Sequence, residues 1–515
     1  MSYERTTPCG QIAGCGCQWP GVAAYKGIRY ATAGRWEYPR PVTHWDGVYQ
    51  ATAYGAACFQ PRSFYDEAQV PEKAFYYHEF REGEHYDYSE DCLFLNIWTP
   101  ENAAPGAKLP VLFYIHGGGF TGGCGNEKHF DGPAWPTKGV VAVTINYRLG
   151  PLGFACLPEL SAEAGHTGNY GLYDQLCALQ WVHDNIEAFG GDPARITVMG
   201  QSAGAMSVQQ LCLSPLARDL IAGAVMSSGG GVSAHFGSVA PAPERYAFWQ
   251  SVARRAGCGS LAALRALPAA DLFAAWQAVQ KLTGGMNCAP VIDGQLIPRD
   301  GALAARRGDQ CAVPYLMGST SEDIVPPIVH KMAKGWCRLQ ADQGRPASYA
   351  WFFDRRLPGD ENGAWHSSDL WYWFGTLDHC WRPMTAHDRL LSEQMVQYLC
   401  NFAATGNPNG GGLPLWQPVY KGQSRVLRLG QGETRMGGVN IAKLTHTMRQ
   451  TKPSANKVSS FLEIPSLFRQ SPPGTAPSGR PGGLCWDCGR PARLALLFAP
   501  KTGIMNKIYT GVLWL

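Results

Sequence analysis

A serine lies between two glycines in the pentapeptide Gly200-Gln201-Ser202-Ala203-Gly204. This fits the G-x-S-x-G pattern of a nucleophile elbow, in which a strand turns sharply into a helix and holds a serine at the apex. Glycines lack Cβ atoms, so strand and helix can approach each other around a strained serine backbone. The serine hydroxyl is then exposed at a helix N-terminus, where developing negative charge is favoured. Alone the pattern is weak, because the chain holds 61 glycines and an ordinary strand-turn-helix connection fits about as well.

Three consecutive glycines follow a short apolar segment, in His116-Gly117-Gly118-Gly119-Phe120. Such a run is poor structural filler, because each glycine loses much backbone entropy on folding. It is useful where backbone N–H groups must approach a ligand closely. A simple glycine-rich turn is the alternative when the run is considered without Ser202.

An acidic pair and a histidine stand further along the chain. Glu322 and Asp323 close the segment Gly318-Ser319-Thr320-Ser321-Glu322-Asp323, which follows a strand candidate at residues 313–317. In α/β sheets, ligands gather at the C-terminal ends of strands, where this segment would lie. His366 lies within an aromatic-rich stretch, residues 348–381. A serine, a histidine and a carboxylate are the groups that nucleophilic catalysis combines.

Alternating strand and helix patterns position these groups. Short apolar segments at residues 91–98, 110–115, 140–146, 196–199, 221–226 and 313–317 indicate strands, and residues 426–429 indicate a last one. Helices are predicted at residues 173–189, 243–278 with a break at 257–259, and 390–402. This alternation favours a mostly parallel sheet with helices on both faces, and residues 10–60 suit small antiparallel strands.

The composition is that of a globular protein with a sizeable core. Of 515 residues, 45% are hydrophobic and 16% charged. The net charge of +4 is concentrated from Lys452 onward, so the part of the chain before Lys452 is nearly neutral. A neutral body gives no electrostatic reason to expect a nucleic acid or an anionic membrane as a partner. The apolar run at residues 494–499 is far too short to span a bilayer.

The cysteines favour a reducing compartment. The chain has 17 of them, an odd number, and its N-terminus lacks the apolar segment of a signal peptide. We therefore expect mostly free thiols and a cytoplasmic location. The Cys485-Trp486-Asp487-Cys488 segment has no second pair nearby, so a metal or redox role for it is not favoured.

With these motifs placed, the chain resembles the type-B carboxylesterase family of the α/β-hydrolase superfamily, which also holds the cholinesterases. Residues 189–204 match that family's active-site signature, and residues 90–100, Glu-Asp-Cys-Leu-Phe-Leu-Asn-Ile-Trp-Thr-Pro, match its second one. Shorter matches lie at residues 27–31, 146–150 and 168–175. The resemblance implies an α/β-hydrolase fold with a mostly parallel central sheet flanked by helices and small N-terminal antiparallel strands.

The resemblance covers about residues 10–449 and therefore implies one carboxylesterase domain at residues 1–452. The remaining residues, 453–515, do not resemble the family. They include the low-complexity segment 471–479, rich in Pro, Gly and Ser, and we expect a disordered tail there.

Carried over residue by residue, the resemblance implies that Ser202 is the nucleophile and His366 the base. The third member is an acid in the 318–323 segment, with Asp323 preferred and Glu322 as the alternative. The order serine, acid, histidine along the chain is that of α/β-hydrolases. Most family members have Glu where Asp323 stands. The shorter Asp must lie closer to the imidazole to make the same hydrogen bond.

The implied reaction is hydrolysis of a small carboxylic ester through an acyl-enzyme, with no metal or organic cofactor. The oxyanion-hole donors would be the backbone N–H groups of Gly118, Gly119 and Ala203. Some of the aromatic residues Phe120, Trp371, Tyr372, Trp373 and Phe374 are expected to line the substrate pockets, with Phe120, Trp371 and Phe374 preferred. Two alternatives stay open: a catalytically silent binding or adhesion module on the same fold, and an amidase or lactonase with the same triad.

Two cysteines also match the family. Cys58 and Cys92 stand where secreted relatives form a disulfide, and in a reducing cytosol we leave open whether they pair. Cys258 has no obvious nearby partner, so a second family bridge is not expected.

Overall fold

The computed structural model describes residues 3–232, 239–423, 425–442 and 444. The expected disordered tail at residues 453–515 and the cysteine pair at Cys485 and Cys488 lie outside the described residues.

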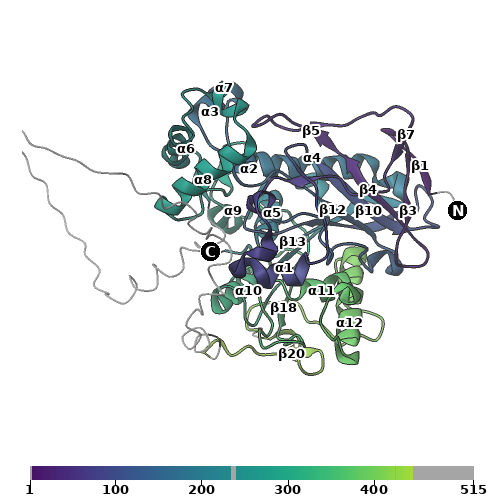
Figure 1. The fold of residues 1–515 in the computed structure, drawn as a ribbon. Helices are drawn as coiled ribbons and strands as arrows, with labels where there is room; N and C mark the ends of the chain where they lie inside the picture. Colours follow the sequence, from purple (N-terminus) through teal and green to yellow (C-terminus); the bar gives the residue numbers. More distant parts are fainter. Residues whose placement is uncertain (1–2, 233–238, 424, 443, 445–515) are drawn as a thin grey trace, which may run out of the picture.

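A large mixed sheet forms the centre of the molecule (Figure 1). In spatial order its strands are β20 (Arg435–Gly437), β19 (Val426–Leu429), β18 (Tyr349–Phe353), β17 (Tyr315–Thr320), β14 (Gly223–Ser227), β13 (Gly191–Gln201), β11 (Leu109–Ile115), β12 (Val141–Ile145), β10 (Phe94–Pro100), β4 (Val22–Arg29) and β3 (Cys15–Gly16).

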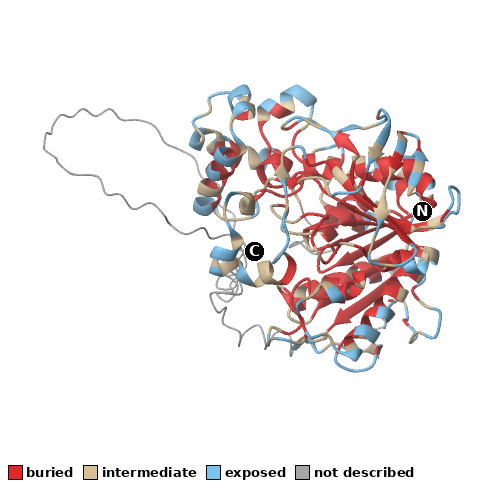
Figure 2. Cartoon of the chain, turned by 45° about the vertical axis from the view of Figure 1, so that its right-hand side comes forward, coloured by how far each residue is buried: buried red, intermediate tan, exposed pale blue. Residues whose placement is uncertain are grey.

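The strands from β12 to β19 all pair in parallel, whereas β10, β4, β3 and β20 join antiparallel at the two edges. Consecutive residues of β11 contribute to separate cores on opposite faces of the sheet, with Phe113 on one and Tyr114 on the other. Strands buried on both faces read as continuous apolar runs, which is why the sequence predicted them. Figure 2 shows this burial along the central strands.

Helices cover both faces of the sheet. They are α1 (Ala74–Phe80), α2 (Gly150–Phe154), α3 (Pro158–Ala164), α4 (Tyr170–Asn185), α5 (Ala203–Leu213), α6 (Pro243–Arg255), α7 (Leu261–Ala266), α8 (Ala269–Thr283), α9 (Gly301–Arg307), α10 (Pro326–Asp342), α11 (Leu370–Phe374) and α12 (Ala386–Thr405). Single 3-10 turns are η1 (Pro61–Phe64), η2 (Glu67–Gln69), η3 (Pro71–Lys73), η4 (Trp135–Lys138), η5 (Ile186–Phe189), η6 (Arg218–Leu220) and η7 (Leu377–His379).

The two faces carry different helices. Apolar residues of α4, α5 and α10 belong to the core that includes Phe113, whereas those of α11 and α12 belong to the core that includes Tyr114. In Figure 1, α4 accordingly lies above the sheet and α11 and α12 below it. Helices α6 and α8 pack together at one end, beside α2 (Figure 1). This is the expected α/β arrangement.

Short strands surround the sheet. Near the N-terminus, β1 (Glu4–Thr7) pairs antiparallel with β2 (Gly10–Ala13), which pairs in parallel with β7 (Val48–Gln50). The other pairs are β5 (Ala31–Thr32) with β6 (Arg40–Pro41), β8 (Ala57–Cys58) with β9 (Tyr88–Ser89), and β15 (Ala240–Pro241) with β16 (Val291–Ile292).

Most predicted elements are present with shifted ends, and some were missed. The predicted helix at 173–189 begins earlier, as α4, and its last residues form the 3-10 turn η5. The strand at 426–429 is β19, but the prediction that it is the last strand is wrong, because the short β20 pairs with it. Strand β18 and helices α9 and α10 were not predicted.

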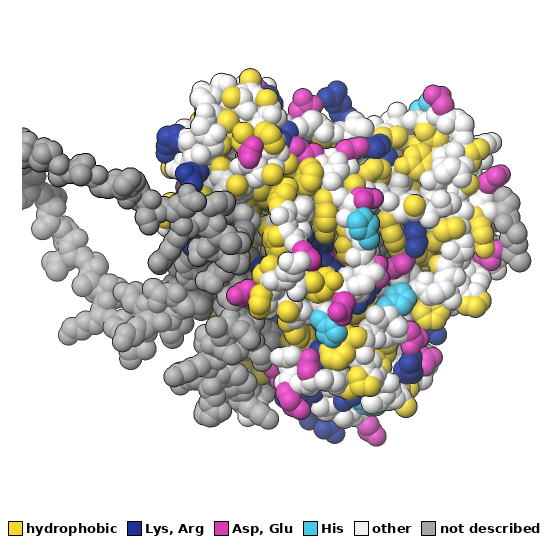
Figure 3. All heavy atoms as spheres, viewed as in Figure 1, with side chains coloured by type: hydrophobic (Ala, Val, Ile, Leu, Met, Phe, Trp, Pro, Cys, Tyr) yellow, Lys and Arg dark blue, Asp and Glu magenta, His cyan; other side chains and the backbone are white. Residues whose placement is uncertain are grey.

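The surface mixes charge types. On the face drawn in Figure 3, Lys and Arg side chains are interspersed with Asp, Glu and apolar side chains. Among the described helices, none combines the length and apolar character needed to cross a bilayer.

Candidate active site

Ser202 occupies a sharp turn between β13 and α5. Its backbone is held at φ 57° and ψ −124°, a positive φ that non-glycine residues rarely adopt. A Cβ on Gly200 would lie 2.3 Å from the carbonyl oxygen of Gly204, and one on Gly204 would lie 2.1 Å from that of Ile115. Both flanking positions therefore require glycine, and the strained serine backbone expected from the sequence is present.

Asp323 and His366 form a buried pair. Asp323 Oδ1 lies 2.6 Å from His366 Nδ1, and both residues are less than 8% exposed. Two backbone contacts bring their segments together. Glu322 N donates to Ala364 O at 3.0 Å, and Glu322 and Trp365 form an isolated parallel β-bridge. The imidazole therefore carries a proton on Nδ1 and leaves Nε2 as an acceptor when the ring is neutral.

The surroundings of Asp323 favour its ionised form. Burial on its own raises the pKa of a carboxyl group, but His366 and the hydrogen bonds from Ser228 and Ile324 lower it, so the pKa of Asp323 lies below its usual range. Ser228 Oγ donates at 2.6 Å and Ile324 N at 2.8 Å, and Thr320 N also donates to the carboxylate, at 3.2 Å. An ionised, fully hydrogen-bonded carboxylate can orient the ring and stabilise its cation.

Glu322, the alternative acid, has other partners. Its Oε2 accepts from Ala364 N at 2.9 Å, and its Oε1 lies 3.7 Å from Arg356 Nη1. Its side chain therefore points away from the imidazole. Of the two acidic residues, the structure brings only Asp323 to His366.

The other imidazole nitrogen contacts Gln201. The amide nitrogen of Gln201 lies 3.1 Å from His366 Nε2, and Gln201 is buried. Among the described residues, the hydroxyl of Ser202 has no hydrogen-bond partner. Ser202 and His366 are therefore not hydrogen-bonded to each other, although both residues line the same cavity. Contacts of this kind are often loose without substrate and tighten in the complex.

The glycine run lies opposite Ser202 in the same cavity. A Cβ on Gly117 would lie 3.1 Å from Ser202 Cβ, and one on Gly118 would lie 2.1 Å from Gly122 O. Gly118 and Gly119 adopt φ 108° and 61°. Among the described residues, neither their N–H groups nor that of Ala203, the first residue of α5, donates to an internal acceptor. Three unused donors next to a serine are the kind of group that can bind an anionic oxygen.

The cavity over Ser202 has a volume of about 220 Å³. It is lined by apolar and aromatic side chains together with the polar groups above. The apolar lining comprises Tyr65, Tyr76, Phe80, Phe130, Met206, Met286, Ile324 and Leu370.

The aromatic residues expected around the substrate do not line this cavity. Phe120, Trp371 and Phe374 are fully buried and belong to the cores, as do Tyr372 and Trp373. Phe120 packs on Phe154, and Phe374 packs on Trp135 with ring centroids 4.5 Å apart. That expectation was wrong, because these rings fill the layers on either side of the sheet.

One wall of the cavity is charged. Arg62 Nη1 lies 2.7 Å from Glu127 Oε1, and Arg81 Nε lies 2.6 Å from Glu67 Oε2. Burial alone would raise the pKa of Glu127, but Arg62 and Arg81 outweigh it and lower that pKa to about 2. Burial lowers the pKa of nearby His129 to about 3, so this ring is neutral at pH 7.

Two polar residues of the site were not singled out from the sequence. Gln201 is the variable position of the elbow pattern, which carries no signal of its own. Ser228 follows β14 and reaches Asp323, while Ser227 O beside it accepts from Ser202 N at 2.9 Å. No motif surrounds this serine pair. The described residues contain no cluster of three or more metal-ligating side chains.

Comparisons with known proteins show the family of the chain. The profile of the Carboxylesterase family matches residues 2–351 and 327–452. The chain is 31% identical to a para-nitrobenzyl esterase of Bacillus subtilis (strain 168), over 82% of this chain and 93% of the relative. It is 30% identical to carboxylesterase 5A of Felis catus, over 79% of this chain and 86% of the relative.

A solved structure of a PNB esterase superposes with a TM-score of 0.74 at 26% identity, covering 87% of this chain and 99% of the other. A thermophilic PNB esterase gives 0.73 at 26% identity, covering 90% and 100%. The ranges matched by the family profile span the elbow, the glycine run, Asp323 and His366. The chain therefore belongs to the carboxylesterase family, with the α/β-hydrolase fold, and is a carboxylic ester hydrolase.

Proposed function

We propose that Ser202, His366 and Asp323 are the triad of this esterase and that Gly118, Gly119 and Ala203 supply the oxyanion-hole donors. The observation that carries the proposal is the 2.6 Å contact between Asp323 and His366, because His366 lines the same cavity as Ser202. Asp323 is a better candidate than Glu322 because only Asp323 contacts the ring.

In the proposed reaction, the Ser202 hydroxyl replaces the Gln201 amide at His366 Nε2 when the substrate binds. His366 takes the hydroxyl proton as Oγ attacks the ester carbonyl carbon, and Asp323 stabilises the imidazolium that forms. The glycine amides bind the oxyanion, and His366 then protonates the leaving alcohol. Water repeats the sequence and releases the acid.

The nucleophile is tested with a fluorophosphonate probe and mass spectrometry. We expect one label per folded chain, on Ser202, and none on the Ser202→Ala variant, which also loses turnover of p-nitrophenyl butyrate by more than about 10³-fold. Ser251→Ala, on α6, is the matched control and should label as the wild type does. Labelling of another residue, or full turnover by Ser202→Ala, contradicts the assignment.

We propose that the substrates are small esters with an apolar acyl group. The support is the size of the cavity, about 220 Å³, and its aromatic and aliphatic lining. A series of p-nitrophenyl esters with acyl chains of graded length tests this. We expect kcat/KM to pass through a maximum at short chains and then to fall. A steady rise to long chains would contradict a small pocket.

We propose a cytoplasmic location, supported by free thiols throughout the described ranges. Cys58 and Cys92 are both buried, and the hydrogen bond between the two thiols together with burial raises the pKa of the Cys92 thiol. Thiol titration of unfolded protein, purified anaerobically from its native host, tests this. All cysteines should react. A deficit of two that maps to Cys58 and Cys92 contradicts the proposal.

A further inference from the structure

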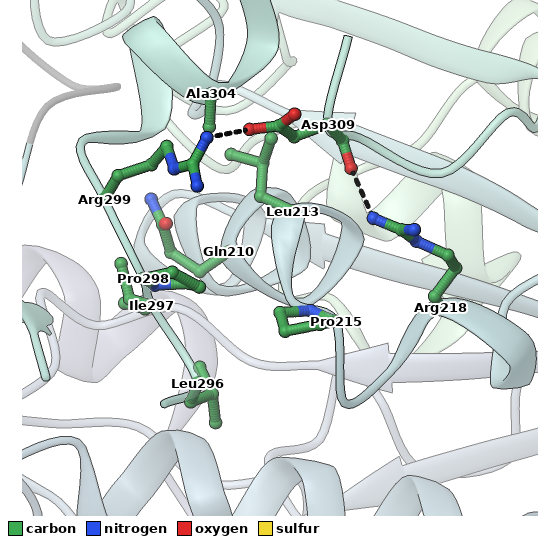
Figure 4. A pocket seen from close by; sticks show the side chains of 10 residues that line it. All are labelled: Gln210, Leu213, Pro215, Arg218, Leu296, Ile297, Pro298, Arg299, Ala304 and Asp309. Atoms are coloured by element: carbon green, nitrogen blue, oxygen red, sulfur yellow. Dashed lines mark hydrogen bonds and ion pairs between the residues drawn. The ribbon is translucent and has the colours of Figure 1, made fainter. Parts of the chain in front are cut away.

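A second cavity lies at the far end of α5, the helix that begins beside Ser202. Its volume is about 200 Å³, similar to that of the catalytic cavity. Figure 4 shows it between the end of α5, residues 296–299 before α9, and Asp309, which follows α9. None of the residues that line it lines the catalytic cavity. It is therefore a separate site.

Two arginines contact Asp309 from opposite sides of this cavity (Figure 4). Arg299 Nη1 lies 3.0 Å from Asp309 Oδ2, and Arg218 Nη2 donates to the backbone oxygen of Asp309 at 3.2 Å. Each guanidinium carries five N–H donors, and within the described chain each has this single acceptor. The cavity wall holds two guanidinium groups and one carboxylate, and only Arg299 contacts that carboxylate, so the wall keeps one excess positive charge.

Gln210 adds an unsatisfied polar group. It projects from α5 toward Arg299 in Figure 4 and is 2% exposed. Its Oε1 is buried without a hydrogen-bond partner among the described residues. A buried amide oxygen without a donor is costly, and turning the amide end for end would instead offer an N–H to an anion. The side chain is thus free to serve a polar ligand.

The rest of the lining is apolar and consists of Leu213, Pro215, Leu296, Ile297, Pro298 and Ala304. We infer that the cavity formed by Arg218, Arg299, Gln210 and this apolar lining is a binding site for a small aliphatic carboxylate. The planar guanidinium forks match a carboxylate, and one excess charge matches a monoanion. The apolar wall suits a short hydrocarbon chain. The acid released by ester hydrolysis belongs to this chemical class.

Direct binding tests the site without turnover, so the result does not depend on the role of Ser202. We would titrate hexanoate against the full chain by ligand-observed saturation-transfer NMR, with 1-hexanol and inorganic phosphate as comparison probes. Hexanoate should bind saturably and more tightly than either. Tighter binding of 1-hexanol or phosphate would overturn the assigned ligand class.

Two sets of variants locate the binding. Arg218→Gln with Arg299→Gln should weaken hexanoate binding at least about tenfold, because charged hydrogen bonds are lost. Arg307→Gln, on the exposed side of α9, removes the same charge and should leave the affinity unchanged. Ala304→Leu fills the cavity while keeping both arginines, and should abolish the saturable signal. Unchanged affinity in the Arg218/Arg299 and Ala304 variants, with hexanoate competing against ester substrate, would place the binding in the catalytic cavity and overturn the inference.

Discussion

The side-chain amide of Gln201 lies 3.1 Å from Nε2 of His366, the nitrogen that must receive the proton of Ser202 in the proposed reaction. Nδ1 of the same ring is held by Asp323 at 2.6 Å. The imidazole is therefore fixed at both nitrogens, and Gln201 competes with Ser202 for one of them.

Replacing Gln201 with Glu should change the pH dependence of catalysis. A carboxylate next to Nε2 favours the protonated ring, because it brings an opposite charge that the Gln201 amide lacks. We expect the acid limb of the kcat/KM profile for p-nitrophenyl butyrate to move up by about one pH unit, because a nearby opposite charge has an effect of this order. Gln50→Glu, at an exposed position, is the control. An unmoved acid limb in Gln201→Glu would show that this contact does not persist during turnover.

Asp323→Asn should lower kcat by about 10⁴, because a neutral amide allows the wrong ring tautomer and does not stabilise the cation. The matched change Glu322→Gln should leave kcat within about threefold of wild type, because Glu322 contacts Ala364 and not the ring. Steady-state kinetics of the two variants decide between the acids. A larger loss in Glu322→Gln would reverse the assignment.

Gly118→Ala should disrupt the oxyanion cradle. Gly118 has a φ of 108°, and a Cβ there would lie 2.1 Å from Gly122 O, so the loop must move. We expect kcat to fall by about 10²–10³, as for loss of one oxyanion donor. Gly257→Ala controls for strain alone, since that glycine also has a positive φ, of 69°, but meets nothing within 4 Å. Equal losses of kcat in both variants would count against a local role.

The Arg62–Glu127 pair should make stability depend on pH. The folded pKa of Glu127 is lowered from its ordinary 4.5 to about 2, so its contribution is complete above about pH 4.5 and is lost as the pH falls toward 2. The shift corresponds to about 3 kcal/mol. Chemical denaturation at pH 3 and pH 7 should show Glu127→Gln destabilised at pH 7, with a smaller difference at pH 3.

The exposed pair of Glu163 and Arg265 provides the comparison for that measurement. Glu163→Gln should change the free energy of unfolding by less than about 1 kcal/mol, because exposed ion pairs contribute little. If the gap between wild type and Glu127→Gln is as large at pH 3 as at pH 7, the pair does not titrate as proposed.

The sequence predicted those parts of the site in which sterics restrict the residue type. The roles of Gly200 and Gly204 could be predicted because a Cβ at either position would collide with the backbone. Strands β11 and β12 could be predicted because both of their faces are buried, which makes them continuous apolar runs. Gln201 and Ser228 carry no such restriction: each acts through a hydrogen bond that exists only after distant segments meet. The placement of Phe120 and Trp371 failed because an aromatic side chain suits a core and a pocket equally well.

The ends of helices and strands, and the short strands at the edge of the sheet, also could not be predicted from hydrophobic patterns. Strand β20 has three residues, too few to establish a periodicity, and it pairs at the edge of the sheet. Helix α10 opens with two prolines, which are tolerated in a first turn but discourage a helix prediction.

The parallel order of the central strands affects when the active site can assemble during synthesis of the chain. Parallel neighbours need long crossovers, so Ser202, Asp323 and His366 arrive on three separate loops at one edge of the sheet. A chain emerging from the ribosome holds Ser202, the proposed nucleophile, long before His366, the proposed base, has been synthesised. Ester hydrolysis by a ribosome-bound chain therefore requires that the segment carrying His366 has been synthesised and has packed against the sheet. A shorter nascent chain is expected to be inactive.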